Sequence, residues 1–131
     1  MKKNILMTLG FLIILTTSWI SYANNWNDPR SLAQEYNDDI NYTSPNNFVR
    51  KWKGHQFTIC KYGRCSKQVG KQEVLQNQKQ WKRDNPTSEC TVTAAWWEGD
   101  NRLGFHCTNG RSDLLTFNKY GKVVKEEVRF E

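Results

Sequence analysis

The stretch that decides the fold is Glu89–Phe130, ECTVTAAWWEGDNRLGFHCTNGRSDLLTFNKYGKVVKEEVRF. Short runs of alternating apolar and polar residues are separated there by three turn signals, Glu98-Gly99, Asn109-Gly110 and Asn118–Gly121. Asn-Gly between alternating runs is a strong hairpin signal, because both central residues of a type I′ turn need a positive φ. The stretch therefore predicts an antiparallel β-meander.

The pairing within the meander follows if the first two turns are two-residue loops. Cys90 would then face Cys107, and Trp96 would face Asn101. Side chains directly opposite each other share a face of the sheet. The resulting apolar face would carry Cys90, Val92, Ala94, Trp96, Leu103, Phe105 and Cys107. Trp97 would lie on the opposite face as an exposed interface anchor, unless a helix covers that face as well.

The basic middle part of the chain predicts further strands and one helix. Phe48-Val49-Arg50, Gln56–Cys60 and Ser66–Val69 have the composition of strands. Lys71–Arg83 carries Val74, Leu75 and Trp81 at helical spacing among good helix formers, and Asn85-Pro86 would end that helix.

The segment before it is polar. Asp28-Pro29 is a helix start, with Asp as N-cap and Pro at the first helical position, so a short helix is expected over Arg30–Tyr36. Asn37–Asn47 is rich in loop-forming residues. The predicted fold class is α+β: an antiparallel β-meander sheet of about five or six strands with one or two short helices, stabilised by disulfides.

Four cysteines allow three disulfide connectivities. Tyr62-Gly63 reads as the tip of a tight hairpin that places Cys60 opposite Cys65, and the meander places Cys90 opposite Cys107. These two bridges are the favoured pairs, and a bridge between the two halves of the chain is the main alternative. No zinc-type spacing of Cys or His is present, so no metal is expected.

The first 23 residues have the pattern of a secretory signal. Lys2 and Lys3 precede the apolar run Ile5–Leu15, and small residues end at Ala23. An uncleaved anchor is the alternative, but the run is short for a bilayer of about 30 Å. Met1–Ala23 is therefore interpreted as a cleaved signal peptide of a bacterial protein destined for the periplasm or the medium. No stable membrane span would remain after cleavage.

The rest of the chain divides into two parts. Residues 24–47 form a polar N-terminal segment with a short helix, and residues 48–131 form a single disulfide-containing β-rich domain. An oxidising compartment agrees with four cysteines in a chain of this size.

Positive charge is concentrated in one third of the chain. Residues 46–83 carry a net charge of +9, whereas residues 24–45 carry −3 and residues 84–131 carry −2. Aromatic residues lie among the cations, a combination that suits polyanions or an acidic protein. The predicted binding residues are Lys61, Tyr62, Arg64, Lys67 and Trp97. The alternative is a solvated basic face whose tryptophans, Trp52 and Trp81, are buried.

One pair of residues resembles catalytic machinery. In the predicted register His106 faces Asp113, and a carboxylate beside an imidazole suits acid–base chemistry. With His55 as a second histidine, these residues could cleave RNA, but two histidines without a fixed spacing are a weak signal. A solvent-facing His–Asp pair is the simpler interpretation of the same residues.

Two functional hypotheses follow. The favoured one is a small exported binding protein, resembling inhibitors or immunity proteins in size and class, which presents its basic and aromatic surface to a protein partner or an envelope polyanion. The alternative is a small secreted basic hydrolase, a ribonuclease using His55 and His106, with nucleic acid as the weaker partner class. Neither hypothesis requires a cofactor, and the scarcity of acid–base groups favours binding over catalysis.

Overall fold

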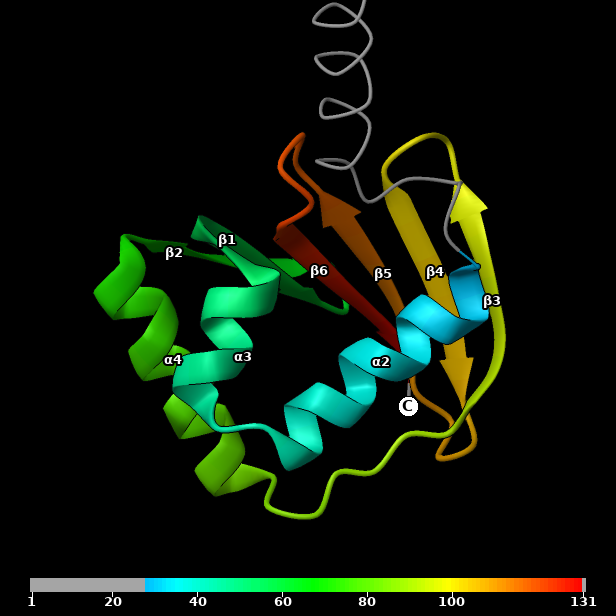
Figure 1. Cartoon of the computed structure of the whole chain (residues 1–131), viewed down its shortest axis with the longest axis horizontal. Helices are drawn as coiled ribbons and strands as arrows, with labels where there is room; N and C mark the ends of the chain where they lie inside the picture. Colours follow the sequence, from blue (N-terminus) through cyan, green and yellow to red (C-terminus); the bar gives the residue numbers. More distant parts are fainter. Residues whose placement is uncertain (1–27, 131) are drawn as a thin grey trace, which may run out of the picture.

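The computed structural model describes residues 28–130, which form three helices and one six-stranded sheet (Figure 1). The elements in chain order are α2 (Pro29–Tyr42), α3 (Pro45–Trp52), β1 (Lys53–Lys61), β2 (Arg64–Val69), α4 (Lys71–Asp84), β3 (Val92–Glu98), β4 (Arg102–Cys107), β5 (Ser112–Phe117) and β6 (Val123–Phe130). The predicted signal peptide, Met1–Ala23, lies outside the described residues.

The sheet is mixed, which corrects the prediction of a purely antiparallel one. Its strand order is β2-β1-β6-β5-β4-β3, and the β1–β6 pair is parallel while the other pairs are antiparallel. The meander β3–β6 is confirmed. Its last strand turns back into the middle of the sheet and supplies backbone partners to the edge of β1 that β2 leaves open (Figure 1).

Helix α2 is longer than predicted. Asp28 caps it by accepting a 3.0 Å hydrogen bond from the Ser31 backbone N–H, as the sequence indicates. The helix continues past Tyr36 to Tyr42, because Asn37 and Ile40 extend the same buried face. Packing against the sheet overrides the low helix propensity of the Asn- and Asp-rich segment.

Helix α3 lies where the sequence predicts a loop and then a strand. Ser44 is its N-cap, and Pro45 is its first residue. Phe48, Val49 and Trp52 are buried on one face, and the i, i+1, i+4 spacing of these residues suits a helix. The interpretation of Phe48-Val49-Arg50 as a strand is therefore wrong, since three residues are too few to separate the two periodicities.

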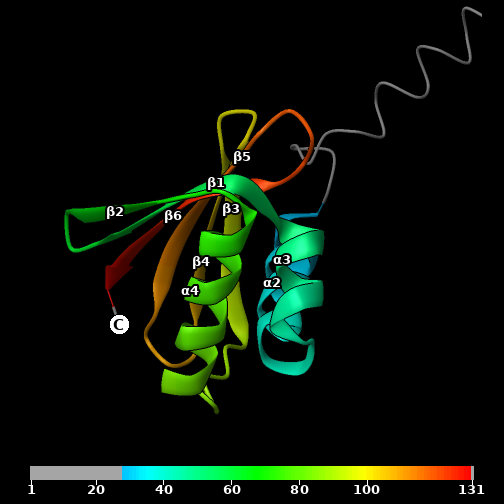
Figure 2. The same ribbon diagram turned by 90° about the vertical axis from the view of Figure 1, so that its left-hand side faces the viewer.

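All three helices lie on one side of the sheet (Figure 2). α2 packs on β3 and β4, and α4, which confirms the predicted helix, packs on β1 and β2. The core between the two layers includes Ala33, Tyr36, Phe48, Phe57, Val74, Leu103, Phe105, Leu115, Phe117 and Val123. None of the helices in residues 28–130 is long and apolar enough to span a bilayer.

The register of the meander differs from the predicted one. Glu98 pairs with Arg102, so the first turn has three residues rather than two. The second turn also has three, because Cys107 and Arg111 flank it and Gly110 has a φ of 89°. This loop is a turn followed by a left-handed residue, the common three-residue hairpin, and it uses Asn-Gly as readily as the two-residue form.

The extra residue exchanges the faces of the two tryptophans. Trp97 lies opposite Leu103 and packs against the core, with its ring centroid 6.2 Å from that of Phe117. Trp96 lies on the other face, where it covers Gly104 and approaches the His106 ring at 4.9 Å. The prediction that Trp96 enters the core and Trp97 does not is wrong.

Both favoured disulfides are confirmed. Cys60 pairs directly with Cys65 across the β1–β2 hairpin, with Cα atoms 4.0 Å apart, and Cys90 is bonded to Cys107 with Cα atoms 5.2 Å apart. The second bridge still forms in the changed register because an irregularity between Val92 and Ala94 places Val92 opposite Cys107. Cys90, two residues before Val92, then lies on the same face of the sheet as Cys107.

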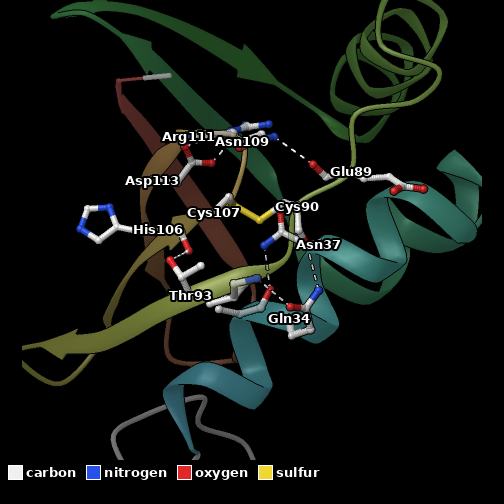
Figure 3. The surroundings of a disulfide bond; sticks show 12 residues. Gln34, Asn37, Glu89, Cys90, Thr93, His106, Cys107, Asn109, Arg111 and Asp113 are labelled. Atoms are coloured by element: carbon white, nitrogen blue, oxygen red, sulfur yellow. Dashed lines mark hydrogen bonds and ion pairs between the residues drawn. A yellow bond between two sulfur atoms is a disulfide. The ribbon is translucent and has the colours of Figure 1, made fainter.

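Gln34 of α2 stabilises this irregular strand end. Its side-chain amide donates to the Cys90 carbonyl at 3.0 Å and accepts from the Val92 N–H at 2.8 Å (Figure 3). The helix thereby satisfies backbone groups that the sheet leaves unpaired.

Candidate functional site

A cavity of about 230 Å³ lies between the helices and the face of the sheet that they cover. We call it the ligand cavity. α2, α4 and the strands β1, β2 and β6 all contribute to its wall. Its lining includes Tyr36, Lys53, Phe57, Gln68, Gln78, Trp81, Arg111 and Glu126. Apolar walls with a few converging polar groups are typical of small-molecule sites.

A buried polar cluster forms one side of the ligand cavity. The Tyr36 hydroxyl donates to Glu126 Oε1 at 2.9 Å, and the Arg111 guanidinium lies 2.7 Å from Glu126 Oε2. Arg111 also contacts both carboxyl oxygens of Asp113 at 3.1 Å. Side chains from α2, the β4–β5 turn, β5 and β6 therefore meet in one network.

The two carboxyl groups of this cluster have opposite pKa shifts. Burial and the neighbouring charge of Glu126 raise the pKa of Asp113 to about 8. Burial also acts to raise the pKa of Glu126, but Arg111 and hydrogen bonds from Asp113 and Tyr36 outweigh it and hold that pKa below the usual value. At neutral pH Asp113 is therefore protonated and Glu126 is ionised.

The ionised groups of the cluster neutralise each other. Glu126 balances Arg111, and Asp113 is 2% exposed and does not line the cavity, so it positions Arg111 rather than meeting a ligand. Arg111 and Glu126 are thus a neutral, rigid part of the wall, which leaves the charge of the cavity to its other residues.

Lys53 is one of these other charged residues, which also include Lys61 and Asp84. Its side chain lines the cavity with Nζ 3.8 Å from the centroid of the Phe57 ring. Within residues 28–130 Lys53 forms no ion pair. Burial lowers the pKa of Lys53 to about 8, so the ammonium is still mostly protonated at neutral pH. An ammonium of this kind is a ready partner for an anion.

Gln68 supplies an acceptor at the same cavity. Its side chain is 7% exposed, and Oε1 is buried without a hydrogen-bond partner among the described residues. A buried carbonyl oxygen left unpaired costs about 1–3 kcal/mol. A ligand that carries an anionic group and a hydrogen-bond donor would satisfy both Lys53 and Gln68.

The predicted basic hairpin lies at the edge of the sheet. Lys61, Tyr62, Arg64 and Lys67 are all exposed on β1, β2 and the turn between them. Lys61 also lines the ligand cavity. Trp97, the fifth predicted binding residue, belongs to β3 at the opposite edge and packs on the core, so it is separate from the hairpin.

The predicted catalytic constellation does not form. His106 pairs with Ser112, whereas Asp113 pairs with Phe105 and turns toward Arg111 on the other face (Figure 3). His55 lies on β1, three strand spacings from β4, or roughly 14 Å at ~4.8 Å per strand. The two histidines are too far apart to act on one phosphodiester, and nothing in the fold supports the ribonuclease alternative.

Sequence reasoning singled out Lys61 but missed Tyr36, Lys53, Gln68 and Glu126 of the ligand cavity. One signal was available for Glu126, a charged residue in phase with Val124 and Val128 in a β-strand. No comparable signal marks Tyr36, Lys53 or Gln68, because their roles depend on how α2 and β2 meet the sheet.

No protein-family model matches this chain, and no curated protein matches it. Solved structures do. A SnoaL-like protein of unknown function from Burkholderia thailandensis aligns with a TM-score of 0.60 at 16% identity, covering 79% of this chain and 94% of that one. A putative isomerase of the SnoaL-like family from Agrobacterium tumefaciens gives 0.57 at 13% identity, covering 77% and 95%.

A third structure is an epoxide hydrolase/cyclase-like enzyme, SalBIII, with a role in pyran ring formation in the polyether salinomycin. It aligns with a TM-score of 0.52 at 16% identity, covering 79% of this chain and 90% of that chain. At these identities the likeness concerns the fold alone. The protein thus has the fold of SnoaL-like proteins and contains two disulfides.

Proposed function

We propose that the protein binds a small organic anion in the ligand cavity, with the negatively charged group of the anion on Lys53. The observation that carries the proposal is the half-buried Lys53 ammonium, which lines the cavity without an ion pair among the described residues. Gln68 Oε1 would accept a hydrogen bond from the same ligand.

The size and charge of the cavity narrow the ligand class. About 230 Å³ is below the roughly 300–1,000 Å³ of typical drug-sized ligand pockets, so the proposed ligand is a small carboxylate or similar anion rather than a polymer. The Tyr36–Glu126–Arg111 network holds one wall rigid, which lowers the ordering cost of binding. Two disulfides are typical of a non-cytoplasmic compartment, which agrees with an exported binding protein.

The test is calorimetric titration of the oxidised protein with a panel of small aliphatic and aromatic carboxylates. Lys53→Gln should weaken binding of a ligand found in this way by tenfold or more. Lys67→Gln, which removes the same charge from an exposed position on β2, is the matched control and should change the affinity less than twofold. Equal affinities of wild type and Lys53→Gln would exclude the proposed site.

The pH dependence gives a second measure. Because the pKa of Lys53 lies at about 8, affinity for a carboxylate should fall as pH rises through 8, while the carboxylate itself stays ionised. An affinity that is constant from pH 6.5 to 9.5 contradicts a role for this ammonium.

The second candidate function is recognition of an acidic partner by the basic hairpin, Lys61–Lys67. Its disulfide fixes the two strands next to an exposed Tyr62, and Lys61, Arg64 and Lys67 are exposed around it. Charge reversal of Arg64 and Lys67 to Glu should abolish capture of such a partner and leave carboxylate binding in the cavity unchanged. Partner capture that survives the reversal rules out this surface.

A further inference from the structure

A second cavity, of about 440 Å³, lies outside the ligand cavity and has a different character. We call it the basic cavity. It lies where the end of α3, the start of β1, the start of α4 and the β5–β6 turn meet. Its lining includes Arg50, Lys53, His55, Lys71, Asn118 and Lys122, and no Asp or Glu is among the residues that line it. Four cations from four chain segments thus line one cavity, and Glu126, which lies outside its lining, interacts electrostatically with Lys53.

Specific contacts join these segments. The Lys122 ammonium donates to the carbonyl oxygens of Arg50 at 2.9 Å and Lys51 at 2.8 Å, which ties the β5–β6 turn to the last turn of α3. The Gly70 N–H donates to the His55 carbonyl at 2.7 Å, which fixes the start of α4 against β1. The backbone segments that line the cavity are therefore held together by the fold.

At the wall of the cavity the start of β1 comes close to β6. Gly54 lines the cavity, and a Cβ at this position would lie 3.1 Å from Val124 Cγ1. α4 begins at the cavity with Lys71, and no side chain caps its first turn. The first N–H groups of a helix have no intrahelical partner and carry positive partial charge. In the same turn the Glu73 carboxylate accepts a hydrogen bond from the Val69 N–H at 3.0 Å.

We propose that the basic cavity binds a phosphate group. A dianion needs more than one cation, and an Arg guanidinium beside Lys ammonium groups suits phosphate oxygens through charge-assisted hydrogen bonds. The site is distinct from the carboxylate site proposed above, although the Lys53 side chain lines both cavities. The phosphate can belong to a soluble phosphate ester or to an anionic lipid headgroup.

The test compares two double variants that remove the same charges. Arg50→Gln with Lys71→Gln changes two exposed residues of the basic cavity, and Arg64→Gln with Lys67→Gln changes two exposed residues of β2 that do not line it. The oxidised protein is titrated with inorganic phosphate and with phenyl phosphate at fixed ionic strength, and binding is followed by calorimetry and by amide chemical shifts. Matching melting temperatures establish that both variants are folded.

The proposal expects saturable phosphate binding by the wild type, a loss of at least tenfold in the Arg50/Lys71 variant, and a change below twofold in the Arg64/Lys67 variant. Equal losses in both variants would mean that only net charge matters and would overturn it, as would absence of saturable binding. Neither variant alters a residue of the ligand cavity, so a failure here is separable from a failure of carboxylate binding.

Vesicles distinguish the source of the phosphate. Binding to phosphatidylcholine vesicles containing phosphatidic acid, lost together with phosphate binding in the Arg50/Lys71 variant, supports the proposal with a lipid headgroup as ligand. Phosphate binding without vesicle binding supports it with a soluble ester. Vesicle binding that persists in the Arg50/Lys71 variant, with no binding of free phosphate, overturns it.

Discussion

The Tyr36 hydroxyl donates a 2.9 Å hydrogen bond to the Glu126 carboxylate, which joins the first described helix to a central strand of the sheet. Tyr36 is 1% exposed and Glu126 4% exposed, so the bond lies away from water. It connects residues 90 positions apart in the chain and fixes how α2 lies over the ligand cavity.

Removing this hydroxyl tests its contribution to stability. Tyr36→Phe should destabilise the protein by roughly 1–3 kcal/mol, because Glu126 loses a donor in a buried position. Tyr42→Phe is the matched control, since Tyr42 also donates to a glutamate, Glu89 at 3.1 Å, but is 74% exposed. Urea denaturation should show no measurable change for the control, and equal effects of the two variants would contradict the buried network.

The raised pKa of Asp113 predicts a pH dependence of stability. In the folded protein Asp113 keeps its proton up to about pH 8, whereas in the unfolded chain it loses the proton near its usual pKa of 3.8. The folded state therefore binds more protons between these values, and the contribution of Asp113 to stability falls as pH rises from about 4 to 8.

Asp113→Asn removes this titration and retains hydrogen-bonding groups toward Arg111 and Glu126. Its stability relative to the wild type should rise with pH between pH 4 and pH 9, by at most about 1.4 kcal/mol per pH unit. The free energies of unfolding of both proteins, measured by urea denaturation across that range, check the prediction. A constant difference would mean that Asp113 is ionised in the folded state.

The contact between Trp96 and Gly104 predicts a steric effect. The Trp96 indole lies directly over Gly104, so that a Cβ at this position would lie inside its van der Waals radius. Gly104→Ala should therefore cost about 1–3 kcal/mol. In a Trp96→Leu background the same change should cost much less, and thermal denaturation of the four proteins gives the coupling energy. Additive effects would contradict the contact.

The two disulfides should differ in their effect on stability. Cys90–Cys107 closes a loop with a sequence separation of 17, and Cys60–Cys65 closes one with a separation of 5. Chain entropy alone predicts a loss of about 3 kcal/mol for the Cys90→Ser/Cys107→Ser pair and about 2 kcal/mol for the Cys60→Ser/Cys65→Ser pair. Denaturant unfolding measures both, and a larger loss for the shorter loop would show that loop entropy is not the main term.

The sequence predicts the strands of the meander correctly and its register incorrectly. Asn109-Gly110 marks a turn in either loop length, so the local chemistry does not distinguish two residues from three. One extra residue per turn exchanges the faces of Trp96 and Trp97 and moves Asp113 away from His106 toward Arg111. The predicted pairing of His106 with Asp113 depended on two-residue turns and is absent from the observed register.

By itself the sequence determined the capped start of α2, helix α4 and the strand segments of the meander, and it favoured both disulfide pairs. Each depends on side chains within a few residues of one another or across one hairpin. Only the tertiary structure decided that β6 pairs with β1 in parallel, that 45–52 is helical, and that Lys53, Gln68 and Glu126 line one cavity. These outcomes depend on which distant surfaces bury each other, and the energy of that burial exceeds the local preferences of the chain.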